Sequence, residues 1–495
     1  MVGPPVRAGK SDLRLGTSEG RWVVVAMVLG SAANFVNLSV VNIALPAIGR
    51  DLDAELNDLQ WVANAYLLPL AALMLVGGSL GDVYGRRRTY LIGGLVFAGG
   101  SVFSVFAPTI EALLIGRVVQ GIGAAAMTPT SLAIVDTSFC EEDRSAAVGA
   151  WASGTAVATA GGPFLGGLLV DALSWRWVFV LGLPLVGASL LATIAHVPET
   201  GPTGPPRRLD LIGAVLSSVA LIGIVFALVQ GPVEEWTDPP VVAALTVGIV
   251  AAIGFVVRER RAADPLLPLG VFSSAQFSGA NAVTLLVYFA LSGVFFFTAL
   301  AFQTGLGYDA AAAGAALVPS NIVMIAASPS VGRFAGRHGP RIPVAVGALV
   351  TAASFAMLAL LDADSQYMTD ILPASLVLGA GLAVLVPPLT SSVLASVSHE
   401  NVGLASAVNN AVARTGGLLA TAMLPGLAGV SGVITLDAGY RRALMISAAM
   451  CALGAVVGYA TVGRGVATHT SQSPTVLSGC AQVSVPAEIS ASPRR

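Results

Sequence analysis

The chain has 495 residues, of which 55% are hydrophobic and only 11% are charged, against about 25% charged residues in an ordinary soluble domain. This composition and a mean hydropathy of +0.82 exclude a soluble enzyme, whose surface would need more charge. The net charge of −2 shows none of the basic excess typical of nucleic-acid-binding proteins. The three cysteines, Cys140, Cys451 and Cys480, are widely spaced, so we expect neither a disulfide framework nor a metal site.

Fourteen apolar runs are long enough to cross a membrane, because a spanning helix needs about 20 residues for a hydrocarbon layer about 30 Å thick. They predict an all-α polytopic membrane protein with fourteen transmembrane helices. The first run is too long for a signal peptide and lacks a small-residue cleavage site. The runs cover residues 22–44, 60–80, 89–107, 112–134, 145–170, 177–197, 209–230, 240–257, 275–301, 312–332, 342–361, 370–394, 402–428 and 441–462.

The basic residues predict the orientation of these helices, because cytoplasmic loops are enriched in arginine and lysine. With the N-terminus placed in the cytoplasm, the cytoplasmic side holds most of the 25 basic residues. The outer loops hold only Arg50, Arg176, Arg441 and Arg442. We therefore expect a multi-pass protein of the cytoplasmic membrane with both termini in the cytoplasm.

A short repeat indicates two related halves. Residues 81–86 (GDVYGR), between the second and third predicted helices, are echoed by residues 332–337 (GRFAGR) after the tenth. This spacing predicts a 6+2+6 arrangement, with a six-helix unit on each side of two extra helices. The expected parts are a cytoplasmic N-terminal segment 1–21, a six-helix bundle 22–197, a cytoplasmic linker 198–208, two extra helices 209–257, a cytoplasmic loop 258–274, a second six-helix bundle 275–462 and a disordered cytoplasmic tail 463–495.

Several longer motifs lie at matching places in this plan. They are residues 77–88 (GGSLGDVYGRRR), 41–48 (VNIALPAI), 116–123 (GRVVQGIG), 162–167 (GPFLGG), 175–179 (WRWVF) and 404–410 (LASAVNN). Together they resemble the major facilitator superfamily, and within it the fourteen-helix drug:proton antiporter branch of multidrug efflux proteins. The resemblance covers most of the chain and implies the major facilitator fold and drug-resistance efflux.

The resemblance also implies two conformational motifs. Asp82 and Arg86, in the predicted cytoplasmic loop, would latch one bundle to the other in one state; the alternative for the arginines is a topology anchor. The antiporter signature, thought to shape a helix bend between the bundles, matches Gly162, Pro163, Gly166 and Gly167. Ordinary glycine-rich helix packing is the alternative for that motif.

Arg117 and Arg414 fall inside predicted helices, where an ionised group is costly unless it faces a partner or a wet cavity. Gln120 lies one turn from Arg117 on the same face. By the resemblance Arg117 helps to move protons, and a structural tie to carbonyl groups is the alternative. Arg414 would line an anion-attracting cavity or bond Asn409 and Asn410.

The first helix departs from the family pattern. Antiporters of this branch carry an acidic residue just before the Asn-x-Ala-Leu-Pro run, whereas this chain has Asn37, which does not titrate. None of the 27 acidic residues lies near the middle of a predicted helix. A proton-coupling group would therefore be one of Asp82, Asp136, Asp210 and Glu111. Arg117 also lacks its expected counter-charge, which favours a neutral or anionic substrate over a cationic drug.

Uncharged polar side chains in several predicted helices are candidates for a substrate cavity, or else for hydrogen bonds between neighbouring helices. The candidate cavity residues are Asn34, Asn37, Asn42, Tyr66, Gln120, Asn281, Gln303, Asn321, Asn409, Asn410 and Arg414.

These observations predict a secondary active transporter that exports small amphipathic drugs or metabolites by alternating access, with proton antiport as the source of energy. No ATP-binding motif is present, and we expect no enzyme activity, no cofactor, no nucleic-acid partner and a monomer in the lipid bilayer. One alternative is an exporter or uniporter that is not coupled to protons. A second is a membrane sensor that kept the fold and lost transport.

Overall fold

The computed structural model describes residues 13–199, 210–397, 402–430 and 432–463. Within these ranges the chain is helical, and its one extended pairing is an isolated bridge between Leu13 and Phe139. Most of the expected N-terminal segment, of the linker 198–208 and of the tail 463–495 lies outside the described residues.

The described residues contain 14 helical spans long and apolar enough to cross a membrane, which confirms the all-α prediction. The helices are α1 (Ser18–Leu52), α2 (Leu56–Tyr84), α3 (Arg86–Val105), α4 (Ile110–Ser138), α5 (Glu141–Ala172), α6 (Trp177–His196), α7 (Leu211–Gln230), α8 (Pro239–Arg261), α9 (Ala275–Thr304), α10 (Ala310–Ala316), α11 (Val318–His338), α12 (Arg341–Leu358), α13 (Leu372–Ala395), α14 (Val402–Ala428) and α15 (Ala438–Thr461). A 3-10 helix, η1 (Leu269–Ser273), precedes α9, and a π-helix, η2 (Tyr367–Ile371), precedes α13.

Two segments predicted as loops are helical. Only Gly85 separates α2 from α3, so Asp82 lies in the last turn of α2 rather than in a loop. The second motif copy, 332–337, lies within α11, which ends at His338 and is followed by the cap residue Gly339. Both glycines have a left-handed φ, 102° at Gly85 and 88° at Gly339, which glycine adopts without strain. The tight turn therefore falls at the fifth residue of the first motif copy and two residues after the end of the second copy.

The apolar run 312–332 is not one continuous helix. It is divided between α10 and α11, which meet at Leu317. Pro319, in the first turn of α11, has no backbone N–H with which to continue α10, so a new helix begins here. The first span is also longer than its predicted run, because α1 continues to Leu52.

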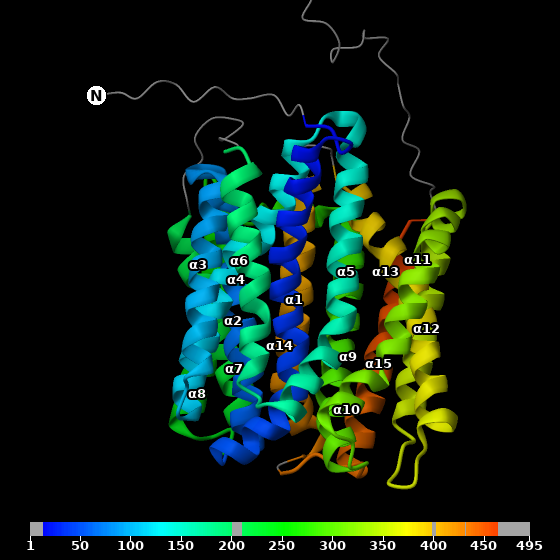
Figure 1. Ribbon diagram of the computed structural model, residues 1–495. Helices are drawn as coiled ribbons and strands as arrows, with labels where there is room; N and C mark the ends of the chain where they lie inside the picture. The colour runs from blue at the N-terminus through cyan, green and yellow to red at the C-terminus, as the bar shows by residue number, and fades with distance from the viewer. Residues whose placement is uncertain (1–12, 200–209, 398–401, 431, 464–495) are drawn as a thin grey trace, which may run out of the picture.

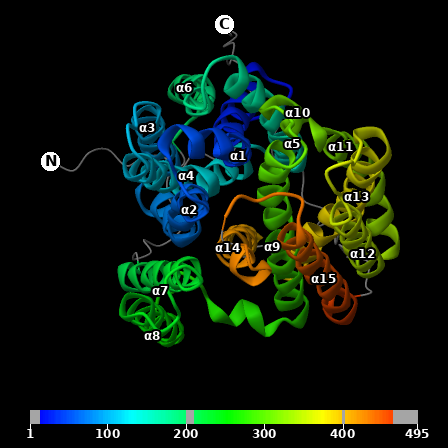
Figure 2. The ribbon, with the colours of Figure 1, turned by 90° about the horizontal axis from the view of Figure 1, so that it is seen from below.

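The spans form two bundles and a separate pair (Figures 1 and 2). Helices α1 to α6 pack on one another, and so do α9 to α15. Helices α7 and α8 pack mainly together, and α7 also touches α2 of the first bundle and α14 of the second. The arrangement is 6+2+6 with the tenth span in two pieces.

The two ends of this bundle differ in charge. We call the end at which α1 begins the basic end, and the other the opposite end. Among the described residues, the basic end holds Arg14, Arg21, Arg86, Arg87, Arg88, Arg144, Arg258, Arg260, Arg261, Arg333, Arg337 and Arg341. The opposite end holds Arg50, Arg176, Arg441 and Arg442. The arginines therefore gather at one end, as the loop assignment predicts.

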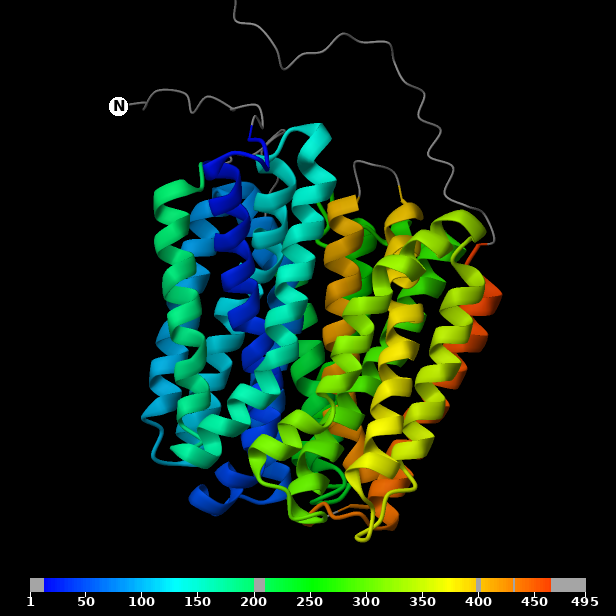
Figure 3. The same cartoon turned by 45° about the vertical axis from the view of Figure 1, so that its right-hand side comes forward.

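Hydrogen bonds join the two bundles toward the opposite end. Gln303 on α9 donates to the carbonyl of Ile43 on α1 at 2.9 Å. Gln60 on α2 donates to the carbonyl of Thr421 on α14 at 2.9 Å, and the Thr421 hydroxyl donates to Asn64 Oδ1. Among the described residues no hydrogen bond or ion pair joins the bundles in the basic half, where Figure 3 shows the helices diverging.

Helices α5 and α10 form a second contact at the opposite end. The Asp171 carboxylate accepts hydrogen bonds from two backbone N–H groups at the start of α10, at 2.7 and 3.1 Å. A Cβ on Gly167 would lie 2.2 Å from the carbonyl oxygen of Ala310, and one on Gly314 would lie 2.2 Å from that of Pro163. The two backbones touch because both positions are glycine. Among the described residues the hydrogen bonds and glycine contacts between the bundles therefore lie toward the opposite end and none lies at the basic end, and we call this arrangement open toward the basic end.

We predict that Asp210→Ala destabilises the protein through the α7–α8 pair. Asp210 caps α7 by accepting from the Gly213 N–H at 2.9 Å, and its nearly buried carboxylate pairs with Arg258 at 3.2 Å. Losing a cap costs about 1 kcal/mol, and Arg258 also loses its partner, so the melting temperature in detergent should fall by a few degrees. The matched control is Asp238→Ala, since Asp238 precedes α8 without a side-chain cap bond. An unchanged melting temperature with lost transport would contradict this and favour a coupling role for Asp210.

Candidate functional site

Arg117 is the most completely buried charged side chain of the first bundle, with 1% of its surface exposed. Its Nε donates to the carbonyl of Val62 on α2 at 3.0 Å. Its Nη1 donates to Asn37 Oδ1 on α1 and, at 2.9 Å, to Gln120 Oε1 on α4. The guanidinium also stacks on the Tyr66 ring, 4.5 Å from its centroid. Arg117 therefore ties three helices together at one point.

Neutral dipoles and an aromatic ring surround this charge. None of the ion pairs among the described residues involves Arg117. Carbonyl and amide oxygens replace the water that the guanidinium loses on burial, and the ring face adds a cation–π contact. The site therefore keeps a net positive charge, and Asn37 occupies the place where the family pattern predicts an acid.

The polar network extends from Arg117 into α3. Gln120 is fully buried, and its Nε2 donates to Ser101 Oγ at 2.8 Å. Two polar atoms beside the network lack a hydrogen-bond partner among the described residues, namely Asn37 Nδ2 and Asn34 Oδ1. A buried polar atom without a partner is costly, so both atoms are available to a water or a ligand.

A small cavity lies between the bundles next to this network. It is lined by Asn34, Phe35, Leu38, Tyr66, Leu70, Thr128 and Arg414. Its volume of about 10 Å³ is that of a single water molecule, so an amphipathic substrate requires the helices to separate further. The cavity brings together three predicted residues, Asn34, Tyr66 and Arg414.

Arg414 is the cationic side chain that the second bundle contributes to this cavity. Its guanidinium lies over the Phe35 ring of α1, 4.7 Å from the centroid. Its buried Nε has no hydrogen-bond partner among the described residues. The predicted tie to Asn409 and Asn410 is absent from the described hydrogen bonds of those residues, so the cavity-lining alternative fits the structure better.

The other candidate residues do not line this cavity. Asn409 donates to Asn281 Oδ1 at 3.2 Å and to Thr284 at 2.8 Å, which ties α14 to α9 inside the second bundle. Asn410 donates to its own helix, and Gln303 belongs to the closure at the opposite end. The half-buried side chains of Asn42 and Asn321 make no hydrogen bond among the described residues. For Asn281, Asn409 and Gln303 the structure favours the helix-bonding alternative.

Asp82 pairs with Arg86 at 3.0 Å within the first bundle. Arg86 also donates to Thr137 Oγ1 at 2.9 Å and to the carbonyl of Ala133, both on α4. Half of the Asp82 side chain remains exposed, and the pair makes no described hydrogen bond or ion pair with the second bundle. The predicted latch between bundles is therefore not engaged in this open arrangement.

The remaining coupling candidates do not touch Arg117. Asp136 and Glu111 are exposed near the two ends of α4, and Asp210 caps α7. In the predicted bend motif, a Cβ on Gly162 would lie 2.9 Å from Ser39 Oγ, and one on Gly166 would lie 2.2 Å from Val40 Cγ1. These glycines let α5 pack closely on α1, and their role in bending stays a prediction.

Sequence reasoning missed several residues that the structure places at functional positions. Thr128 and Phe35 line the cavity, and Asp171 and Thr421 join the two bundles. A single polar residue near a helix end, such as Asp171, is too common a feature to distinguish it. Its partners are backbone groups about 140 residues away, which no local pattern reveals.

Comparison with known proteins gives the family. A family model described as the Major Facilitator Superfamily matches residues 27–421. The chain belongs to the Major Facilitator Superfamily. Among curated superfamily proteins it is 33% identical over 422 residues to the multidrug resistance protein Stp of Mycobacterium tuberculosis, covering 85% of this chain and 78% of that protein. It is 34% identical over 401 residues to the tetracenomycin C resistance and export protein of Streptomyces glaucescens, covering 81% and 74%.

Solved structures support the fold. A crystal structure of the peptide transporter POT in complex with sulfate matches with a TM-score of 0.67 and 15% identity, covering 91% of this chain and 96% of that one. At this identity the match establishes the major facilitator fold alone.

We predict that Arg117→Gln and Arg117→Lys both reduce transport by at least about 10-fold. A lysine ammonium is a point charge and does not reproduce a planar group that bonds Val62, Asn37 and Gln120 and stacks on Tyr66. Transport into inverted vesicles, at equal protein level and melting temperature, measures the effect. Arg441→Gln, at the exposed start of α15, is the control. Full activity of Arg117→Lys would mean that charge alone suffices.

Proposed function

We propose that this superfamily member is an exporter of small amphipathic drugs or metabolites in the cytoplasmic membrane, working by alternating access. The observation that carries the proposal is a pair of bundles bonded at one end and free at the other, with a polar, cationic site between them. The resistance and export proteins to which the chain is similar support the direction and the substrate class.

We propose that the basic end faces the cytoplasm, with both chain termini on that side. The positive-inside rule supports this, since the described arginines outside the spans gather at this end. The structure then corresponds to the inward-facing state, in which an exporter collects substrate from the cytoplasm or the inner leaflet. We further propose a monomer that needs no nucleotide and no cofactor.

The charge of the site supports neutral and anionic substrates. Arg117 and Arg414 both contact aromatic rings at the cavity, and no described ion pair neutralises either of them. Two uncompensated cations in a low-dielectric region repel a third, whereas an anionic or polar group would satisfy Arg414 Nε and Asn37 Nδ2.

We propose proton antiport as the energy source, with Asp82 as the first candidate for the coupling group. Asp82 is half exposed at the basic end, and its only ion-pair partner among the described residues is Arg86. Protonation would weaken that pair and change how α2 and α3 are held. The second candidate function is an exporter without proton coupling. It is favoured by Asn37, which binds Arg117 as a neutral acceptor.

Proton flux in proteoliposomes with a pH-sensitive dye distinguishes these functions. Neutral and anionic amphipathic compounds are added in turn to wild type, to Asp82→Asn and to empty vesicles. We expect substrate-dependent proton movement in wild type and at least about 10-fold less in Asp82→Asn. Substrate accumulation without proton flux would favour the uncoupled exporter. Binding without accumulation of any compound would favour the sensor that lost transport.

We predict opposite changes in charge selectivity from two substitutions. Asn37→Asp would place a carboxylate against Arg117 and should raise the transport of lipophilic cations relative to anions. Arg414→Gln should lower anion transport and affect neutral compounds less, because it removes the cation that lines the cavity. Competition between matched cationic, neutral and anionic dyes gives the ratios. A wild type that already prefers lipophilic cations would contradict the proposed selectivity.

A further inference from the structure

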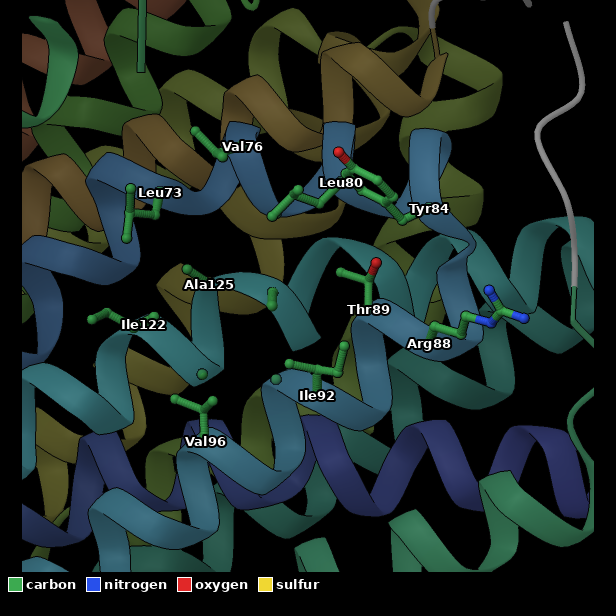
Figure 4. A pocket seen from close by; sticks show the side chains of 14 residues that line it. Leu73, Val76, Leu80, Tyr84, Arg88, Thr89, Ile92, Val96, Ile122 and Ala125 are labelled. Atoms are coloured by element: carbon green, nitrogen blue, oxygen red, sulfur yellow. The ribbon is translucent and has the colours of Figure 1, made fainter. Parts of the chain in front are cut away.

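A groove runs along the outside of the first bundle, between α2 and α3. Each of these helices packs closely on α4, and they touch one another less, so α4 forms the floor. Its volume is about 460 Å³, within the range of small-molecule pockets (Figure 4). None of its residues lines the cavity at Arg414. The groove is therefore separate from the proposed substrate site.

Polar side chains in the groove are confined to one end. Tyr84, Arg88 and Thr89 lie together at the basic end, and the remaining lining residues are aliphatic or glycine (Figure 4). At 1.5 Å per residue, the stretch of α2 from Leu73 to Tyr84 is about 16 Å long. This is about half of a hydrocarbon layer 30 Å thick. The groove has the length and the polarity of one acyl chain that extends from a membrane surface to the midplane.

The charge at the mouth favours an anionic group. Arg86 is held by Asp82, and Arg87 donates to two carbonyls at the end of α6. Arg88 is different, because 77% of its side chain is exposed and its only ion-pair partner among the described residues, Glu199, lies 3.7 Å away. A headgroup phosphate beside Tyr84 and Arg88 would meet a cation that the described chain holds only loosely.

We propose that this groove binds an anionic phospholipid, with one acyl chain on the α4 floor and the phosphate at Arg88. The lipid belongs to the leaflet at the basic end, which is the cytoplasmic leaflet under the proposed orientation. Exposed aliphatic side chains among the lining residues, Ile92 on α3 and Ile122 on α4, agree with contact to lipid rather than to water. The site lies between α2 and α3, next to the Asp82–Arg86 pair. A bound lipid would therefore contact the same two helices that this ion pair joins.

Native mass spectrometry of the purified full chain tests the proposal. The protein is titrated with phosphatidylglycerol or with phosphatidylcholine of identical acyl chains. We expect wild type to retain phosphatidylglycerol preferentially. One arginine at a membrane surface contributes about a 5-fold preference, so Arg88→Gln should remove most of it. Val76→Phe and Ile92→Phe, which fill the groove from α2 and α3, should lower the retention of both lipids.

Matched controls are Arg333→Gln, an exposed arginine of the second motif copy, and Val346→Phe, an exposed position on α12. Equal retention of the two lipids by wild type would overturn the proposal. An unchanged preference for phosphatidylglycerol in Arg88→Gln would also overturn it, as would a loss of lipid retention in the control variants equal to that in the groove variants. Because the readout is binding and not transport, a failed transport assay leaves this test intact. If one groove variant does not fold, as judged by its melting temperature, the other still tests the groove.

Discussion

The buried charge of Arg117 is the constraint on which the first bundle depends. A guanidinium in the apolar layer is tolerated only where several acceptors converge, and here they come from Val62, Asn37 and Gln120 on three helices. Their convergence requires close packing. A Cβ on Gly121 would lie 2.4 Å from the carbonyl oxygen of Tyr66, so glycine lets α4 approach α2 next to the arginine. The motif GRVVQGIG thus supplies both the charge and the small residues that bring its partners within reach.

The contacts between the bundles suit a reversible closure. Among the described residues the polar contacts are hydrogen bonds to carbonyl, amide and carboxylate oxygens, glycine-mediated backbone contacts and apolar packing accompany them, and no ion pair joins the bundles. Single hydrogen bonds between membrane helices contribute about 0.6 kcal/mol on average. A few such bonds contribute about 2 kcal/mol to the closure, which is small enough for a ligand that prefers the other state to offset. A buried ion pair between the bundles would be costlier to break.

The spans and the gathering of arginines at one end were predictable from the sequence. A bilayer requires apolar segments of about 20 residues, and basic residues concentrate in the loops on one side of it. The Arg117–Gln120 contact was predictable from helical spacing alone. The partners of Asn281, Asn409 and Gln303 were not. Apolar residues are spread over all sides of their helices, so no periodicity indicates which face meets another helix or a cavity. Asp82 was placed in a loop because glycine punctuation suggested a turn, but only Gly85 requires a left-handed backbone.

The identity of residue 37 also determines how protons could act. A carboxylate at Asn37 would exchange a proton beside Arg117, so substrate and proton would compete at one place. Asn37 instead forms a contact with Arg117 that does not titrate. Any proton coupling must then act on a group outside the Arg117 network, such as Asp82, whose ion pair lies at the basic end. Protonation there would change the equilibrium between the two states without directly displacing substrate. The coupling free energy would then be limited to the difference in proton affinity between those states.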